Sequence, residues 1–343
     1  MTALHLTIAL DAMGGDYGIP VVVPAALKVL RKHSSVRLVL VGDQEQISAA
    51  LREHQADVGA RLTIQHASQK VEMDDLPSVA LRNKKDSSMR IAINLVKSGD
   101  VDACVSAGNT GALMAVARFV LKTLKGIDRP AICTALPTIS GRTHMLDLGA
   151  NIGSGPEVLQ QFAVMGSELA NAVDGIENPT VGLLNIGEEE MKGGEEIKKA
   201  AELIASSGVN YYGFVEGDDI FKGTVNVVVC DGFIGNIALK SGEGVAKMVT
   251  HFLKEEFKRS FFSKLRALIA LPVLKAFKNR VDPGRYNGAT LIGLQGIVVK
   301  SHGGADVDSF ANAIEVAIKE VDHNVPERIA KQVETLLVER RAG

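Results

Sequence analysis

The sequence predicts a doubly wound α/β fold, a Rossmann-like α/β/α arrangement in which helices cover both faces of a mainly parallel sheet. Short apolar runs rich in Val, Ile and Leu alternate with longer segments of helical periodicity along the chain. Six of the connecting turns combine glycine with Asp, Asn, Lys or His at strand ends, where open α/β sheets bind ligands. With 343 residues, 46% of them apolar, the chain can form a large core, and we expect one domain over residues 1–343.

The individual elements follow from local signals in chain order. Asp43 is a suitable N-cap for the second helix, and the run at 225–229 is the most β-branched strand pattern in the chain. The segment 77–98 carries several cations among apolar residues, as a solvated helix face does. We expect strands over 4–10, 36–41, 62–66, 101–105, 131–136, 144–148, 181–184, 225–229 and 296–300. We expect helices over 20–30, 43–54, 77–98, 113–121, 156–173 and 195–206, a helix that ends at 257, and two helices after 306.

The turn at 106–112 is the most informative of the glycine-rich turns. Gly108, Asn109, Thr110 and Gly111 lie between a buried strand and a helix, so their backbone N–H groups can face an anion at a helix N-terminus. A single turn of this kind more often has only a structural role. Similar turns occur at 11–18, 147–151, 185–194, 231–236 and 301–306, and their number favours a functional role for the turn at 106–112 over a purely structural one. We expect all of these turns along one edge of the sheet.

Charge and cysteine content narrow the functional classes. The net charge is −2, so no global field attracts nucleic acid, and no apolar run is long enough to span a membrane. Three cysteines, an odd number within apolar runs, indicate a reducing, cytoplasmic setting. Motifs of P-loop nucleotide hydrolases, serine hydrolases and zinc proteases are absent from the sequence. We expect Cys230 to be a buried structural thiol and expect neither a cofactor nor a metal.

The remaining polar residues suggest that the protein binds its nucleophile. Inorganic phosphate held by backbone amides and by Lys192 or Lys240 could attack an acyl carbonyl, and the same donors could stabilise the oxyanion. His302 follows a strand end, and a catalytic role and a structural role are equally supported. Asp231 and Asn236 are expected to orient these groups. The acidic run 188–190 could hold a cation, although acids at a helix start are more often solvated.

The segment 258–280 carries seven cations and no acid, interleaved with large apolar residues. Pro272 is expected to break it into a basic amphipathic helical hairpin at about 258–281. One interpretation is a dimer interface formed by the apolar sides of two helices. The other is a surface that meets an acidic carrier protein or anionic lipid, and the absence of acids favours this second interpretation.

Taken together, the motifs resemble those of the bacterial acyl-carrier-protein:phosphate acyltransferases. The resemblance covers nearly the whole chain, in the blocks DAMGGD at 11–16, SAGNTGA at 106–112, GIDRP at 126–130, DLGAN at 147–151, LNIGEE at 184–189, DGFIGN at 231–236 and KSHG at 300–303. It implies transfer of a long fatty acyl group from acyl-carrier protein to inorganic phosphate, which yields acyl-phosphate for phospholipid synthesis. It also implies a fold related to phosphate acetyltransferases and isocitrate-type dehydrogenases.

The resemblance further implies a cytoplasmic homodimer that works near the membrane and supplies a membrane glycerol-3-phosphate acyltransferase. The segment 258–280 would then contact the membrane peripherally, and no nucleic acid is involved. The expected catalytic residues are Lys192, Lys240, His302, Asp231 and Asn236. The expected substrate-binding residues are Asp11, Gly14, Gly15, Gly108, Asn109, Thr110, Gly111, Asn151 and Asn185.

Two other functions stay open at this level. Strand-end carboxylates and the related folds allow a metal- and NAD-dependent hydroxyacid dehydrogenase of the isocitrate type. The basic segment 258–280 allows a lipid-surface scaffold without catalytic activity.

Overall fold

The computed structural model describes residues 6–189, 191–281 and 283–342, with the side chains at 265, 278–281, 283 and 337–342 left out. The expected strand at 4–10 therefore begins partly outside the described residues. The strands are β1 (Leu6–Asp11), β2 (Val36–Gly42), β3 (Leu62–His66), β4 (Ala103–Ser106), β5 (Ala131–Thr138), β6 (Gly141–Leu146), β7 (Thr180–Leu184), β8 (Asn210–Val215), β9 (Val227–Val229), β10 (Ala289–Ile292) and β11 (Ile297–Lys300). The helices are α1 (Ile19–Lys32), α2 (Gln44–Glu53), α3 (Pro77–Asn83), α4 (Ser88–Ser98), α5 (Thr110–Leu121), α6 (Pro156–Asp174), α7 (Glu195–Ala205), α8 (Asp219–Lys222), α9 (Gly232–Lys258), α10 (Phe261–Val281), α11 (Val307–Asp322) and α12 (Val325–Ala342), with a 3₁₀ turn at Pro283–Tyr286.

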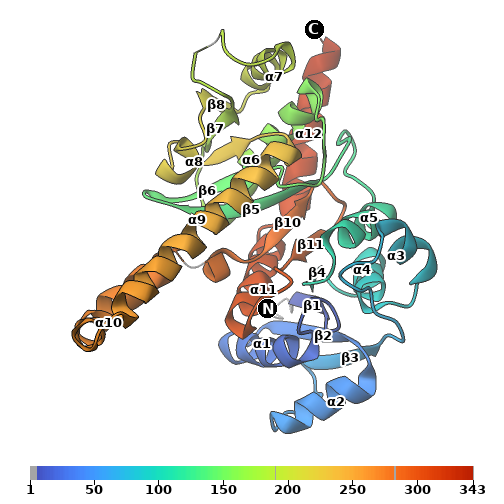
Figure 1. Cartoon of the computed structure of the whole chain (residues 1–343). Helices are drawn as coiled ribbons and strands as arrows, with labels where there is room; N and C mark the ends of the chain where they lie inside the picture. The colour runs from blue at the N-terminus through green and yellow to red at the C-terminus, as the bar shows by residue number, and fades with distance from the viewer. Residues whose placement is uncertain (1–5, 190, 282, 343) are drawn as a thin grey trace.

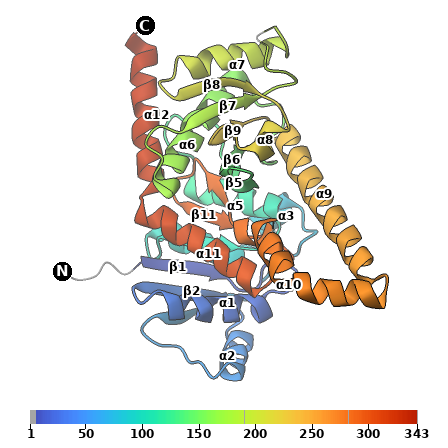
Figure 2. The same ribbon diagram turned by 90° about the vertical axis from the view of Figure 1, so that its left-hand side faces the viewer.

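The eleven strands of the described residues form one sheet in the order β3-β2-β1-β4-β11-β10-β5-β6-β9-β7-β8. Neighbouring strands are parallel except around β10, which is antiparallel to β11 and β5, and between β5 and β6. Helices cover both faces: α1 and α11 pack on one side of the N-terminal half, and α4 and α5 on the other. In the C-terminal half, α6, α7 and α12 form one layer (Figures 1 and 2). The doubly wound α/β prediction is confirmed.

The three antiparallel pairings reverse the strand direction between the two halves of the sheet. Consequently β1, β4 and β11 run opposite to β6, β9 and β7, and the expectation that all polar turns share one edge is wrong. The two halves are nevertheless connected through α9, which follows β9, because Lys240 of this helix lies close enough to Lys300 and His302 for its charge to act on both.

Three other expectations about the elements need correction. The segment 77–98 forms two helices instead of one, because Ser87 leaves the helical conformation and accepts a hydrogen bond from Arg90 N as the N-cap of α4. The strands β8 and β10 lie in segments where no strand is expected. Pro272 lies inside α10, so the helical hairpin consists of α9 and α10 with its turn at 259–260. A proline removes only one backbone hydrogen bond from a helix, so this 21-residue helix continues through Pro272.

The α9–α10 hairpin forms an arm that extends away from the body of the molecule (Figure 1). The two helices diverge from the turn at 259–260 (Figure 2), and they contact each other. Within the described part of the chain, no helix has the length and apolar character needed to cross a lipid bilayer.

Candidate functional site

The loops after β1, β4 and β11 form what we call the first loop cluster, made of residues 11–18, 106–111 and 300–306. These strands are neighbours in the order β1-β4-β11, so their carboxyl ends meet. Two backbone hydrogen bonds join the loops, from Asp16 N to Gly303 O and from Ser301 N to Ser106 O, each 2.9 Å. The sequence places these three turns together correctly.

Asp11 is the internal anchor of this cluster. Its side chain is buried, and Oδ2 accepts a hydrogen bond of 2.6 Å from Ser106 Oγ. Ser106 Oγ in turn accepts from Gly108 N at 3.0 Å. Burial raises the pKa of Asp11, although hydrogen bonds from Ser106 and Ser88 act against this shift. Asp11, expected among the substrate-binding residues, thus points into the protein and holds two loops together.

Gly14 and Gly15 allow the close approach of the three loops. A Cβ atom on Gly14 would lie 2.5 Å from Asp11 Oδ2 and 2.9 Å from Gly108 N. Gly15 has a φ of +85°, and its Cβ would lie 3.0 Å from Gly303 O. Both glycines are therefore needed for the backbone geometry of the expected substrate-binding turn.

The turn after β4 leads into the N-terminus of α5. Asn109 caps this helix, since its Oδ1 accepts a hydrogen bond from Ala112 N at 3.0 Å. Its Nδ2 donates to the carbonyl oxygens of Met73 and Asp75, at 2.7 and 3.1 Å. The side chain of Asn109 is thus used within the protein. Thr110 and Gly111 lie exposed in the first turn of α5, where backbone N–H groups and the helix dipole favour an anion.

Lys300 is the buried cation inside this cluster. It begins the KSHG motif at 300–303 but is not among the expected site residues. Its buried Nζ donates hydrogen bonds to the carbonyl oxygens of Ala107, at 3.2 Å, and of Ser301. Burial lowers the pKa of Lys300 to about 8, opposed by the charges of Asp11 and Asp16. Both bonded partners are neutral carbonyls, so no contacting carboxylate cancels the charge. The sequence signal that could have indicated Lys300 as a site residue is its position at the end of the apolar run that forms β11.

His302 and Lys240 extend the positive region of the first loop cluster. His302 Nδ1 accepts a hydrogen bond of 3.1 Å from Gly304 N, so the neutral ring carries its proton on Nε2. Burial lowers the pKa of His302, and the nearby charge of Lys240 on α9 lowers it further. Lys240 also faces Lys300, and it forms an exposed ion pair of 3.0 Å with Glu243. The structure therefore brings Lys240 and His302 together, as the sequence analysis expects.

The loops after β6, β7 and β9 form a second loop cluster, made of residues 147–154, 185–194 and 231–236. Asp231 caps α9 by accepting from Phe233 N at 2.9 Å, and it also accepts from Ser154 N at 2.8 Å. Asn151 is buried, and its Nδ2 donates to Pro130 O and to Asp147 Oδ2. Asp231 and Asn151 therefore shape the loops. Asn236 is exposed in the first turn of α9, one helical turn before Lys240.

The loop 185–194 holds Asn185 and Lys192. Asn185 Nδ2 donates to the carbonyl oxygens of Gly187 and Lys192, at 3.1 and 3.2 Å. Lys192 forms a 2.7 Å ion pair with Glu189, which raises the pKa of Lys192. Between β7 and β11 there are five strand-to-strand steps, or about 24 Å at the usual spacing. The structure thus separates Lys192 from Lys300, and a substrate that touches both must be extended.

The three cysteines are poor nucleophiles. All are buried, and burial raises the pKa of each thiol. The charges of Asp147 and Asp231 raise that of Cys230 further. The structural role expected for Cys230 is confirmed. In the described residues, no three His, Cys, Asp or Glu side chains are grouped so that they could hold a metal ion, while Glu190 of the acidic run 188–190 lies outside them.

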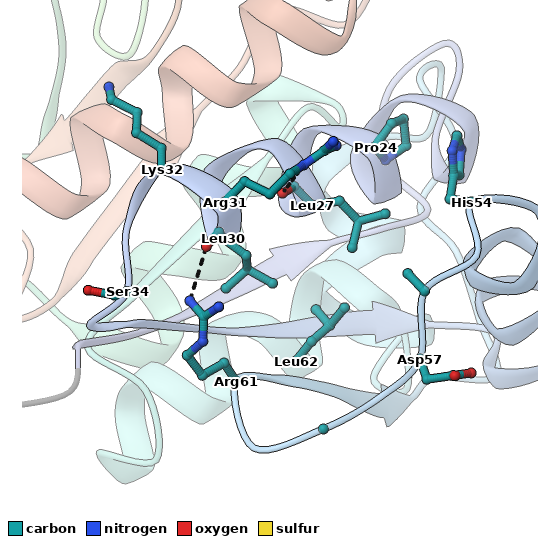
Figure 3. A pocket seen from close by; sticks show the side chains of 12 residues that line it. Pro24, Leu27, Leu30, Arg31, Lys32, Ser34, His54, Asp57, Arg61 and Leu62 are labelled. Atoms are coloured by element: carbon teal, nitrogen blue, oxygen red, sulfur yellow. Dashed lines mark hydrogen bonds between the residues drawn. The ribbon is translucent and has the colours of Figure 1, made fainter.

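A groove of about 760 Å³ lies between α1 and the segment before β3, away from both loop clusters (Figure 3). Its Arg61 donates hydrogen bonds to Leu30 O and His33 O, at 3.0 and 2.8 Å. The guanidinium group thus satisfies carbonyl groups at the C-terminal end of α1. None of the expected site residues lines this groove.

Comparison with known proteins identifies the family. A family model described as "Fatty acid synthesis protein" matches residues 6–328. A phosphate acyltransferase of Nitrosococcus oceani is 62% identical over 336 residues, which cover 98% of this chain and 99% of the relative. The chain belongs to the phosphate acyltransferase family. A second phosphate acyltransferase, of Methylococcus capsulatus, is 63% identical over 97% of this chain and 98% of its own length. The chain is therefore an acyltransferase, and the family resemblance seen in the motifs is confirmed.

Solved structures support the fold of this phosphate acyltransferase. The EutD phosphotransacetylase from Staphylococcus aureus superposes with a TM-score of 0.62 at 18% identity, covering 92% of this chain and 94% of that chain. A phosphotransacetylase from Streptococcus pyogenes gives a TM-score of 0.63 at 18% identity, with the same coverage. The expected relation to the fold of phosphate acetyltransferases is confirmed.

Proposed function

We propose that the protein transfers a long-chain fatty acyl group from acyl-carrier protein to inorganic phosphate and forms acyl-phosphate for phospholipid synthesis. The main support for this proposal is the first loop cluster, which combines a helix N-terminus, the buried cation Lys300 and the neighbouring Lys240 and His302. This arrangement suits a phosphate dianion. The family name and its fatty acid synthesis model support an acyl group as the other reactant.

The proposed reaction needs no nucleophile from the protein. An oxygen atom of the bound phosphate attacks the thioester carbonyl carbon, the new C–O bond forms, and the C–S bond breaks as the thiolate leaves. The N–H groups of the first turn of α5 and Lys300 hold the phosphate, and Lys240 and His302 lie beside it. Lys240 is proposed to stabilise the oxyanion on the acyl carbonyl, because it lies beside Lys300 and His302, while Asp231 and Asn236 shape the start of α9. Lys192 lies about 24 Å from Lys300 by strand spacing, too far to contact the same carbonyl oxygen.

The direct test of this function is thiol release. Palmitoyl-carrier protein, phosphate and the pure protein are mixed, and the free carrier thiol is measured together with hydroxylamine-trapped acyl-phosphate. We expect thiol release only when phosphate is present. Release without phosphate would refute the proposal. Two alternatives, the hydroxyacid dehydrogenase and the scaffold without activity, gain no support from the family match, and neither is proposed.

Replacing Lys240 with Ala is expected to lower kcat by on the order of 10², because its ammonium group is proposed to stabilise the oxyanion. The ammonium group is available for this role, since Lys240 is about half exposed and an ion pair such as the one with Glu243 is weak at such a site. Steady-state kinetics with saturating phosphate measure the effect. Lys198→Ala, which removes a comparable ion pair on α7, is the control. A rate equal to that of the wild type would move the role to His302.

We further propose that the α9–α10 arm joins two copies of the chain and holds the dimer against a membrane. Large apolar side chains on both helices are exposed, among them Met248, Phe252, Phe261 and Ile269. The segment 258–280 has no acid, and its expected cations Lys278 and Arg280 lie outside the described side chains. An acyl-phosphate made at this position would reach a membrane glycerol-3-phosphate acyltransferase directly.

Two measurements separate these proposals. Light scattering after gel filtration should give the mass of a dimer for the full chain and of a monomer for Met248→Glu with Phe252→Glu. Sedimentation with phosphatidylglycerol vesicles should carry the wild-type protein down, and sedimentation should fall when Phe261 and Phe262 become Ser. A monomeric wild-type protein contradicts the dimer, and a wild-type protein that stays in the supernatant contradicts the membrane contact.

A further inference from the structure

Three consecutive helices, α3, α4 and α5, contain no Asp or Glu. The charges on the helices themselves are therefore all positive, while the adjoining loops carry both signs, with the exposed acids Asp86, Asp100, Asp102 and Asp128. The helices pack against one another on one side of the N-terminal half (Figure 1). We call this surface the α3–α5 face, and its cations, all exposed except the half-buried Arg90, are Arg82, Lys85, Arg90, Lys97, Arg118, Lys122 and Lys125.

An exposed aromatic ring lies among these cations. The side chain of Phe119 is 53% exposed, which is unusual for a large apolar residue at the end of a helix. The guanidinium carbon of Arg90 lies 5.4 Å from the ring centroid, and Lys122 Nζ lies 4.8 Å from it. The ring therefore contacts two cations, and neither forms an ion pair with an acid among the residues that the structure describes. Aromatic and arginine side chains of this kind dominate binding energy in protein interfaces.

The α3–α5 face is directly connected to the first loop cluster. The helix α5 begins at Thr110 in that cluster and reaches Phe119 nine residues later, about 14 Å along the helix axis. A protein bound over Phe119 would thus lie within reach of the loops through a flexible prosthetic arm. In Figure 1 the face lies on the opposite side of the molecule from the end of the α9–α10 arm, which carries the exposed apolar side chains suited to a second copy or a lipid surface.

We propose that the α3–α5 face docks the acidic carrier protein that delivers the acyl thioester, with Phe119 and its two cations at the centre of the contact. The inference rests on the proposed acyl transfer from a carrier protein and adds the surface that recognises it. Charge complementarity selects an acidic protein, and the single aromatic ring, in place of a continuous apolar row, favours a protein surface over a lipid bilayer.

The test uses the full-length variant Arg118→Glu with Lys122→Glu. We expect its KM for palmitoyl-carrier protein to rise by about tenfold or more, with the difference shrinking as salt is added, because opposite charges become like charges. Its rate with S-palmitoyl pantetheine, which has no carrier protein, should stay within twofold of the wild type. Phe119→Ala should raise the KM for the carrier alone in the same way.

The matched control is Arg52→Glu with Lys331→Glu, which changes the net charge by the same amount at exposed positions of α2 and α12. Arg52 lies in the last turn of α2, just as Arg118 lies in the last turn of α5. Fluorescence anisotropy of labelled carrier protein, without acyl group or phosphate, measures docking independently of chemistry. If the protein binds the carrier but releases no thiol, the proposed function is wrong and the docking proposal is still supported. The docking proposal is overturned if the wild type and the double variant bind the carrier equally well, or if the control variant loses as much affinity as the double variant. It is also overturned if the double variant loses vesicle binding in place of carrier binding.

Discussion

Replacing Lys300 with Met is expected to lower kcat/KM for phosphate by about 10²–10³, the loss that follows when one preorganised charged donor is removed. Methionine has a similar length and no charge, so the apolar stem still fills its place. Lys300 bonds to carbonyl groups of two of the three loops in the first loop cluster. Its loss therefore removes both the positive charge and the link that aligns the loops toward an anion.

The pH profile distinguishes the charge of Lys300 from its structural contacts. The groups that face it are Asp11 and Asp16 of the β1 loop, Lys240 of α9 and the neighbouring His302. With a pKa of about 8, Lys300 loses its proton as the pH rises through 8, so phosphate affinity should fall on the alkaline side. Lys300→Arg keeps the charge and should shift this fall to higher pH, whereas Lys300→Met should show no such fall.

The measurement is kcat/KM for phosphate between pH 6.5 and 9.5, together with the melting temperature of each variant. A purely structural role would lower the rate of Lys300→Met and Lys300→Arg in proportion to the melting temperature and leave the alkaline fall unchanged. That outcome, or an unchanged kcat/KM in Lys300→Met, would remove Lys300 from the phosphate site.

Replacing Glu320 with Gln is expected to stabilise the protein at pH 7 by about 2 kcal/mol. Glu320 is buried on α11, and its Oε1 accepts a hydrogen bond from Thr290 Oγ1, while Oε2 has no partner among the described residues. Burial raises its pKa from 4.5 to about 8. Between these values the folded state holds a proton that the unfolded state has lost, so stability falls as the pH rises from about 4.5 to about 8.

Glutamine is neutral at every pH and keeps the acceptor for Thr290, so the variant should lose this dependence. Glu315→Gln on the same helix is the matched control. Burial acts to raise the pKa of Glu315, but hydrogen bonds from Lys32 and His33 outweigh it and lower the pKa. That variant should be less stable than the wild type at pH 7. Urea unfolding at pH 5, 7 and 8.5 measures both, and an equal loss of stability in the two variants would contradict this account of Glu320.

Local signals in the sequence predict most elements, because they depend on neighbouring residues. The N-cap Asp43 accepts a hydrogen bond from Gln46 N as expected, and the strand over 62–66 is found at the expected bounds. The reversal of strand direction depends on the hairpin between β5 and β6, whose turn at Ile139 and Ser140 is a weak signal between two expected strands. One short turn thus decides whether the polar loops form one cluster or two.

The candidate site is predictable only in part, for the same reason. The positive φ of Gly15 and the N-cap role of Asn109 are local to their own turns, and their motifs indicate them. The contacts of the same residues with other loops are not encoded locally. A lysine at the end of a strand is expected to be solvated. In the structure β11 pairs with β4, and Lys300 is buried. The approach of Lys240 to His302 joins residues 62 positions apart in the sequence through the course of α9, which no local pattern encodes.

The central claim is that the acyl group passes directly to a bound phosphate and is never attached to the protein. Acyl exchange tests it: palmitoyl-carrier protein is mixed with radiolabelled holo-carrier protein and the enzyme, with and without phosphate. Direct transfer predicts label in the palmitoyl-carrier pool only when phosphate is present, through reversal from acyl-phosphate. Exchange in the absence of phosphate would require an acylated residue of the protein and would contradict the account.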